Sequence, residues 1–275
     1  MVSSRYVDVD GIRTHYLEGG EGRTVVLLHS GEFGAAAEIS WEYTIGPLSR
    51  HYRVVAPDWL GYGRTDKVHD FTSGLARRIR HLKRFLEILA IDQADFIGNS
   101  MGGSVFARVL GDGASFPVRS LTMISSGGFT PVNDDRRALM AYDCTRESMR
   151  AAVAAMFHDP KWAADDAHIE KRYQMSAIPG AWECAAAARF KSPLVPAREE
   201  FGLPDATKYE NLKMPVLLIA GANDKLREPG YAFELAKRIP RSEVHVIENC
   251  GHCAHIEHSE KVNGLLLDFL AKEWA

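Results

Sequence analysis

The sequence predicts an α/β protein in which a mostly parallel β-sheet carries helices on both faces. Two observations support this fold class. Short apolar runs typical of buried strands alternate with amphipathic helical segments along most of the 275 residues. Residues 129–209 break this alternation, because they contain only helical stretches separated by prolines. We therefore expect a core formed by residues 1–128 and 210–275, with residues 129–209 inserted as a helical cap.

The expected elements follow in order along the chain. Residues 6–9 and 12–17 alternate around Asp10-Gly11, which predicts a β-hairpin. Apolar runs at 24–29, 53–56, 94–98, 120–124, 215–220 and 244–247 predict buried strands. Helices are expected at 75–90, 104–110, 231–238 and 260–272, and within the cap at 149–157, 168–175 and 181–190.

Composition excludes several classes of protein. The chain is 46% hydrophobic and 25% charged, which is typical of a globular protein with a full core. Its formal charge of −3 provides no basic field, so we expect no nucleic-acid partner. No apolar run approaches the roughly 18 residues that span a bilayer, and the first residues lack a signal-peptide core. Together with four cysteines, these features predict a cytoplasmic protein with reduced thiols and no membrane partner.

A glycine-flanked serine lies between one predicted strand and the following helix. Residues 98–102 read Gly-Asn-Ser-Met-Gly and fit the G-x-S-x-G nucleophile elbow, in which the serine sits on a sharp strand-to-helix turn. Glycines suit this turn because side chains there would collide with the neighbouring elements. The alternative is an ordinary strand-to-helix turn. Since a free hydroxyl is a poor nucleophile, Ser100 requires a base.

The base and its acidic partner are expected at the carboxyl ends of two later strands. His252 follows the strand at 244–247, whereas His255 and His258 belong to the next helical segment. Asp224 follows the strand at 215–220 and is preferred to Asn223, because only a carboxylate stabilises an imidazolium. The prediction is a catalytic triad of Ser100, His252 and Asp224. In the alternative reading, Asp224 caps a turn and His252 is a surface residue.

An oxyanion hole is expected beside the serine. One donor is the N–H of Met101, and the other comes from the turn at 29–35, where Gly31 is the expected donor. His29 in that turn is expected to be structural. Cys250 and Cys253 have a C-x-x-C spacing, but an isolated pair seldom forms a zinc site. We expect neither a metal nor an organic cofactor.

Along its whole length the chain resembles the α/β-hydrolases, which share the order nucleophile, acid, histidine. More narrowly, it resembles the meta-cleavage product hydrolases. The similarity lies in residues 98–103 (Gly-Asn-Ser-Met-Gly-Gly), in Cys250-Gly251-His252, in Glu257-His258 and in Gly46-Pro47. The resemblance implies hydrolysis of a carbon–carbon bond in a 2-hydroxy-6-oxohexa-2,4-dienoate, a product of aromatic ring opening.

The same resemblance implies substrate-binding residues. Arg172 lies in a cap segment similar to the one that carries the substrate-carboxylate arginine, and a guanidinium suits a carboxylate. Asn99 is expected near the same end of the substrate. Ser40 falls where the family has an active-site asparagine, and Cys253 falls where a tryptophan is common. For Arg172, a solvated helix arginine is the alternative.

Other departures leave the substrate open. Glu32 and Phe33 stand where the family's oxyanion turn has glycine and proline. A carboxylesterase or lactonase that uses the same triad therefore remains the alternative, and a non-enzymatic receptor is a third possibility that an intact triad disfavours. We expect a small-molecule substrate carrying a dienol carboxylate or an ester, and a homodimer.

Overall fold

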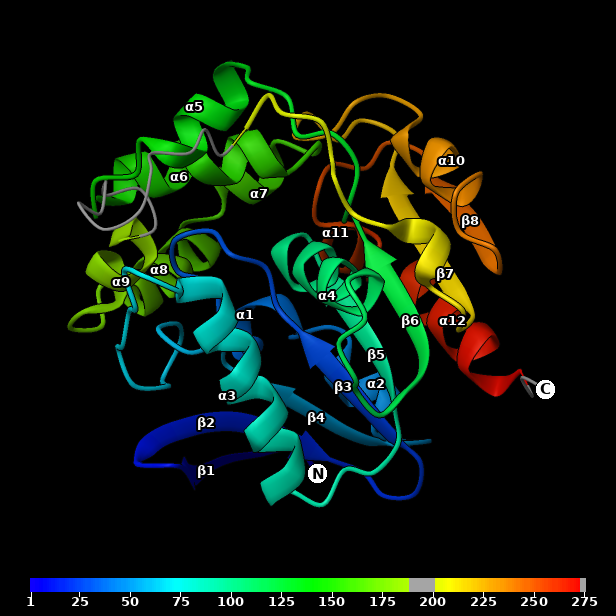
Figure 1. The fold of residues 1–275 in the computed structure, drawn as a ribbon. Helices are drawn as coiled ribbons and strands as arrows, with labels where there is room; N and C mark the ends of the chain where they lie inside the picture. Colours follow the sequence, from blue (N-terminus) through cyan, green and yellow to red (C-terminus); the bar gives the residue numbers. More distant parts are fainter. Residues whose placement is uncertain (188–200, 273–275) are drawn as a thin grey trace.

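A single mixed sheet runs through the computed structural model, which describes residues 1–187 and 201–272 (Figure 1). Its strands lie in the order β1-β2-β4-β3-β5-β6-β7-β8. Their bounds are β1 Ser3–Val9, β2 Ile12–Gly19, β3 Thr24–Leu28, β4 Arg53–Pro57, β5 Ala94–Asn99, β6 Val118–Ile124, β7 Val216–Gly221 and β8 Ser242–Ile247. The predicted hairpin is confirmed, since β1 and β2 are antiparallel and Val9 pairs with Ile12. From β4 to β8 all neighbours are parallel.

Helices cover both faces of this sheet, as predicted. The helices of the core are α1 Ala37–Ser40, α2 Ile45–Leu48, α3 Gly74–Ile88, α4 Met101–Gly111, α10 Tyr231–Ala236, α11 Ala254–Glu257 and α12 Ser259–Ala271, together with the 3-10 helix η1 Tyr209–Asn211. Successive residues of the strands point to opposite faces of the sheet and belong to two separate apolar clusters. One cluster joins the sheet to α3, α4 and α10, and the other joins it to α1, α2, α11 and α12. Strands buried on both faces explain the continuous apolar runs in the sequence.

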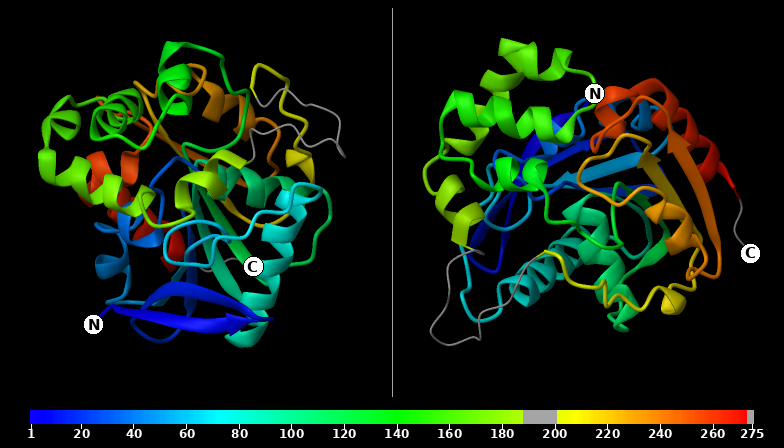
Figure 2. Two further views of the ribbon diagram at one scale, coloured as in Figure 1. Left: turned by 90° about the vertical axis from the view of Figure 1, so that its left-hand side faces the viewer. Right: turned by 90° about the horizontal axis from the view of Figure 1, so that it is seen from above.

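Among the described residues between β6 and β7, helices joined by loops are present and no strand is found. This segment contains α5 Asp134–Met140, α6 Arg146–Met156, α7 Lys161–Ala164, α8 Asp166–Ser176 and α9 Ala181–Ala187. These helices lie together at one end of the sheet (Figures 1 and 2). The helices expected at 149–157 and 168–175 correspond to α6 and α8. The one expected at 181–190 begins as α9, and residues 188–190 lie outside the described residues. The division of the chain into a core and a cap at residues 128 and 210 remains our interpretation.

Within residues 1–187 and 201–272, no helix combines the length and the apolar character needed to cross a membrane.

Candidate active site

Ser100 occupies a strained turn between β5 and α4. Its backbone has φ 50° and ψ −113°, a conformation that residues other than glycine seldom adopt. The flanking glycines permit this turn. A Cβ added to Gly98 would collide with the backbone of Gly103, and one added to Gly102 would collide with the carbonyl of Leu28. The elbow geometry predicted from residues 98–102 is therefore present, and it presents the hydroxyl at the carboxyl edge of the sheet.

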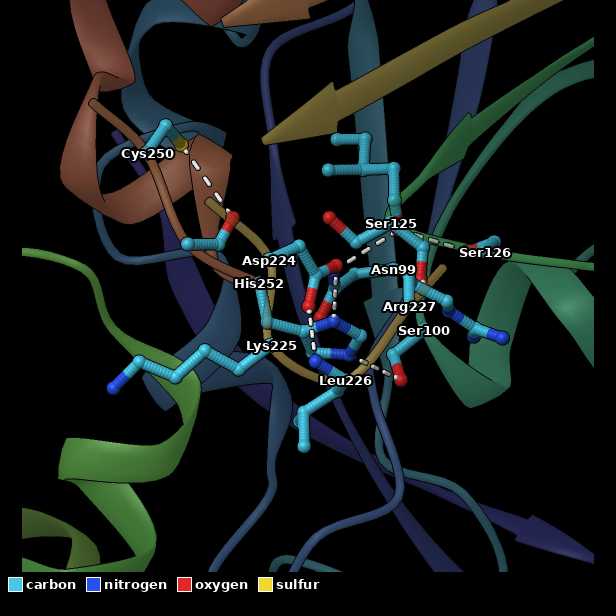
Figure 3. A network of polar contacts seen from close by, with 12 residues as sticks. Asn99, Ser100, Ser125, Ser126, Asp224, Lys225, Leu226, Arg227, Cys250 and His252 are labelled. Carbon is cyan, nitrogen blue, oxygen red and sulfur yellow. Dashed lines mark hydrogen bonds and ion pairs between the residues drawn. The ribbon is translucent and has the colours of Figure 1, made fainter. Parts of the chain in front are cut away.

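A continuous hydrogen-bonded chain joins Ser100 to His252 and Asp224 (Figure 3). Nε2 of His252 lies 2.8 Å from Oγ of Ser100, and its Nδ1 lies 2.7 Å from Oδ2 of Asp224. The other carboxylate oxygen of Asp224 accepts a bond of 2.9 Å from the N–H of Leu226. His252 follows β8 and Asp224 follows β7, so parallel strands deliver both to the same edge as the serine. The three side chains thus form the arrangement of a nucleophile, a base and an orienting acid.

Asp224, the acid of the hydrogen-bonded chain, is buried and remains ionised. Asp224 is 8% exposed and His252 is 3% exposed. Burial acts to raise the pKa of Asp224, but the charge and hydrogen bond of His252 and the charge of Arg227 outweigh it, so the pKa is lowered. An ionised carboxylate keeps the proton of His252 on Nδ1, which leaves Nε2 free to take the proton of Ser100.

Glu257 fixes the loop that carries His252. One of its carboxylate oxygens accepts the N–H of Gly251 at 2.7 Å, and the other accepts those of His158 and Asp159 at 2.9 and 3.1 Å. The backbone N–H of His252 donates to the carbonyl of Met156 at 2.7 Å. The histidine loop is therefore tied to the segment that follows α6, in the helical insertion. Glu257 entered the sequence analysis only as part of a family-like signature, and its positioning role becomes visible in these contacts.

The two expected oxyanion donors lie side by side. A Cβ added to Gly31 would come within 3.0 Å of Cβ of Met101. The hydroxyl of Tyr62 donates to the carbonyl of Gly31 at 3.1 Å, which helps to hold this turn. His29 is fully buried, and its Nε2 accepts the N–H of Trp59 at 3.0 Å. Burial lowers the pKa of His29, and its contacts are those of a structural residue.

A cavity of about 240 Å³ opens onto Ser100. Its walls include four of the predicted catalytic and oxyanion residues and several residues of the helical insertion, namely Gly31, Ser100, Met101 and His252 with Arg136, Leu139, Met156 and Ala185. Asp224 lies behind His252. The four predicted substrate-binding residues are absent from the described lining of this cavity: Arg172, Asn99, Ser40 and Cys253.

Arg172 instead forms a buried ion pair with Glu32. Its Nη1 lies 3.0 Å from Oε1 of Glu32, and the two side chains are 1% and 7% exposed. The Nε–H of Arg172 donates to Nε2 of His168 at 3.0 Å. Burial opposes ionisation of Glu32, but the charge of Arg172 and hydrogen bonds from Ser30 and Arg172 together outweigh burial, so the pKa of Glu32 is lowered. Glu32 lines the cavity and Arg172 lies directly behind it. The solvated surface position that was the alternative for Arg172 is therefore wrong.

The other three expected substrate contacts are buried beside the elbow. Nδ2 of Asn99 donates to the carbonyl of Ile124 at 3.1 Å. Oγ of Ser40 lies 3.5 Å from Oγ of Ser30. Cys253 is 3% exposed, and burial raises the pKa of its thiol well above the ordinary value. Their roles in substrate binding remain predictions.

The cysteines and the acidic residues do not gather into a metal site in the described part of the chain. No group of three His, Cys, Asp or Glu side chains there is placed to hold an ion. Cys250 and Cys253 are both buried as free thiols.

Sequence reasoning missed two arginines that line the cavity. Arg136 lies on α5, a helix that was not predicted, and Arg227 lies three residues after Asp224 in the loop that follows β7. Position offered a signal for Arg227, because loops at the carboxyl ends of parallel strands carry site residues. The sequence offered no signal for Arg136, since the adjacent Arg137 has the same chemistry and is exposed to solvent.

Comparison with known proteins identifies the family of this chain. The model of the alpha/beta hydrolase family matches residues 25–265. The chain belongs to this alpha/beta hydrolase family. It is therefore an α/β-hydrolase enzyme, as the resemblance implied.

Relatives of this α/β-hydrolase cover nearly its whole length. It is 36% identical to a 2-hydroxy-6-oxo-6-(2'-aminophenyl)hexa-2,4-dienoic acid hydrolase of Metapseudomonas resinovorans over 98% of this chain and 91% of the relative. It is 31% identical to a 2-hydroxy-6-oxo-2,4-heptadienoate hydrolase of Pseudomonas putida strain F1, over 98% and 96%. Among solved structures, a serine hydrolase involved in carbazole degradation superposes with a TM-score of 0.84 at 33% identity, covering 98% of this chain and 99% of the other. The chain thus resembles the meta-cleavage product hydrolases, as its motifs suggested.

Proposed function

We propose that the protein hydrolyses a carbon–carbon bond in a 2-hydroxy-6-oxohexa-2,4-dienoate-type product of aromatic ring opening. The observation that carries this proposal is the hydrogen-bonded chain from Ser100 through His252 to Asp224, at the wall of a cavity. Relatives named for dienoate hydrolysis at 31–36% identity support this substrate class.

In the proposed reaction the dienol first becomes a ketone by a proton transfer in which His252 takes part. The ketone withdraws electrons from the bond to be broken. Ser100 then attacks the remaining carbonyl as His252 accepts its proton, and the N–H groups of Gly31 and Met101 stabilise the oxyanion. The carbon–carbon bond then breaks and its electron pair moves toward the ketone. The leaving dienolate takes the proton held by His252, and an acyl-enzyme remains. His252 activates the water that hydrolyses this ester, while Asp224 orients the imidazole.

A carboxylesterase or lactonase remains the second candidate, and one specific contact favours it. Arg172, the expected anchor of the dienoate carboxylate, already binds Glu32 inside the protein. For Arg172 to anchor a substrate, this ion pair would have to open. An ester of a neutral acid needs no such anchor. A homodimer in the cytoplasm remains our expectation for either enzyme, and sedimentation equilibrium tests the dimer.

Spectrophotometric assays distinguish the two functions. We expect wild-type protein to bleach a coloured 2-hydroxy-6-oxohexa-2,4-dienoate much faster than it hydrolyses p-nitrophenyl acetate or butyrate. Ser100→Ala should lose at least about a thousandfold in kcat, because the nucleophile is removed. Ser115→Ala is the matched control, since Ser115 is exposed in the loop that follows α4 and lies outside this cavity lining. Ester hydrolysis by a protein that leaves the dienoate untouched would move the enzyme to the esterases.

A further inference from the structure

Two buried arginines face the catalytic cavity without an ion-pair partner in the part of the chain that the structure describes. Arg136 is 9% exposed and Arg227 is 8% exposed, and both line the cavity that contains Ser100. No described carboxylate lies within ion-pair distance of either guanidinium. Buried charges in proteins are normally paired, because removing an ion from water is costly.

The protein's own contacts satisfy these guanidinium groups only in part. Nη2 of Arg136 donates to the carbonyl of Leu226 at 2.8 Å, whereas its buried Nε has no hydrogen-bond partner. Arg227 donates from Nε to the carbonyl of Ser125 at 3.1 Å, and from Nη1 and Nη2 to hydroxyl groups at 3.2 and 3.4 Å. All of these acceptors are neutral, so both positive charges remain uncompensated by a bonded anion.

The two positive charges also act on each other. Burial is the main cause that lowers the pKa of Arg136 to about 10, and the charge of Arg227 adds to it. At neutral pH Arg136 is still protonated. The charge of Asp224 interacts with both arginines, but its carboxylate is already bonded to His252 and Leu226. In Figure 3 the side chain of Arg227 lies beside the Ser100–His252 pair.

We propose that Arg136 and Arg227 form a carboxylate-binding subsite of the catalytic cavity. A carboxylate placed there would gain charge-assisted bonds from two forked guanidinium groups and would relieve their mutual repulsion. Arg172 differs from these two arginines, because it is already paired with Glu32. The subsite adds a substrate contact to the proposed function. It rests on that function only in assuming that the substrate binds beside Ser100. The bound carboxylate comes either from the dienoate itself or from a second acid group on the acyl portion.

Arg136→Gln tests this subsite, and Arg137→Gln is the matched control. Arg137 is the next residue of α5, is exposed and lies outside the described cavity lining. Two p-nitrophenyl esters of glutaric acid serve as probes, one with a free second carboxylate and one with that group methylated. We expect Arg136→Gln to raise KM for the free acid by about tenfold to a hundredfold, with little change for the methyl ester. Arg136→Lys should recover part of the loss, and Arg137→Gln should behave as wild type.

Two dienoates identify the source of the carboxylate. If Arg136→Gln raises KM only for a dienedioate with an acid on its acyl portion, the subsite binds the second acid. If KM rises equally for a 6-oxoheptadienoate, the subsite binds the dienoate carboxylate. Either result supports the proposal. Equal changes for charged and neutral substrates, or no change for any of them, would overturn it.

Equilibrium binding keeps this test separate from the proposed reaction. Glutarate binding to Ser100→Ala protein, measured by calorimetry against glutaramide, requires no catalysis. We expect glutarate to bind more tightly than glutaramide, and Arg136→Gln to abolish that preference. If the protein fails to cleave dienoates but still prefers glutarate, the proposed function is refuted and the subsite is supported. Equal affinity for glutarate and glutaramide would refute the subsite, whichever substrate the protein cleaves.

Discussion

The pairing of Glu32 with Arg172 changes how the cap arginine is interpreted. Both residues were singled out from the sequence, Arg172 as a substrate anchor and Glu32 as a departure from the family's oxyanion turn. Their ion pair joins the core to α8 across 140 residues of chain. Each partner is buried, so each stabilises an otherwise uncompensated charge of the other.

A double-mutant cycle measures this coupling. Glu32→Gln should destabilise the protein by about 3 kcal/mol in urea unfolding, because it leaves a buried guanidinium unpaired. Arg172→Met in the Glu32→Gln background should recover much of that loss, since the unpaired charge is then gone. Additive losses would show that the two side chains are not coupled. Dienoate turnover by the double variant also tests Arg172 as an anchor, because a true anchor cannot be removed without a large rise in KM.

Residues whose positions follow from chain order were predictable, and those set by long-range contacts were not. Ser100, Asp224 and His252 each follow a recognisable strand, so parallel pairing brings them to one edge. Nothing in the sequence links Glu32 to Arg172, because no periodicity relates residues so far apart. The choice between Arg136 and Arg137 as the cavity residue depends on the facing of a helix of seven residues.

At the scale of secondary-structure elements, the loop after β8 depends on α11 for its position. Glu257 is in α11 and accepts three backbone N–H groups, from Gly251 and from the start of the segment that follows α6. A carboxylate suits this role, because both of its oxygens are acceptors. The contact therefore fixes the distance between the histidine loop and the helical insertion.

Glu257→Gln should weaken this attachment. The amide nitrogen of glutamine cannot accept, so at least one backbone N–H loses its partner. We expect a loss of about 1–3 kcal/mol in the free energy of unfolding and a lower kcat, because His252 adjoins Gly251. Urea titration and steady-state kinetics measure the two effects. Glu260→Gln, an exposed change on α12, is the control. Unchanged stability and kcat would mean that other contacts hold the loop.

Strands were easier to predict than short helices. Strands β3 to β8 were expected within two residues of their observed bounds. Burial on both faces leaves a continuous apolar run. The strand at 244–247 was wrongly expected to be buried, since β8 lies at the edge of the sheet and is only partly buried before Ile247. Helices α1, α2, α7 and α11 have four residues each, too few to show a helical period. The seven-residue α5 was missed for the same reason, although Asn133 caps it by accepting the N–H of Arg136.

At the scale of the whole molecule, two buried histidines and one partly buried histidine make stability depend on pH. Burial lowers the pKa of His255 and of His168 to about 3, and that of His81 to about 4. In the unfolded chain these groups have ordinary values near 6.5. The folded state therefore binds fewer protons below pH 6.5. The stability that these histidines contribute is fully present above pH 6.5. It is lost as the pH falls toward the pKa values of the folded state.

His255→Gln isolates one of these contributions. His255 is 1% exposed and packs against the ring of Trp41. Between pH 7.5 and pH 5, the wild type should lose roughly 2 kcal/mol through this residue alone, and the variant should lose correspondingly less. Urea unfolding at both pH values measures the difference. The exposed control His51→Gln should leave the pH dependence unaltered. Identical slopes for wild type and His255→Gln would refute the assignment.

The order of the strands has a consequence for biosynthesis. The elbow strand β5 and its neighbours β3, β4 and β6 precede the helical insertion, whereas Asp224 and His252 follow β7 and β8, in the last quarter of the chain. On the ribosome, a nascent chain that already contains Ser100 still lacks His252 and Asp224, its hydrogen-bonded partners in the folded protein. We therefore expect Ser100, the proposed nucleophile, to be inactive until the final strands have emerged and paired. Hydrolytic activity then reports the completed fold.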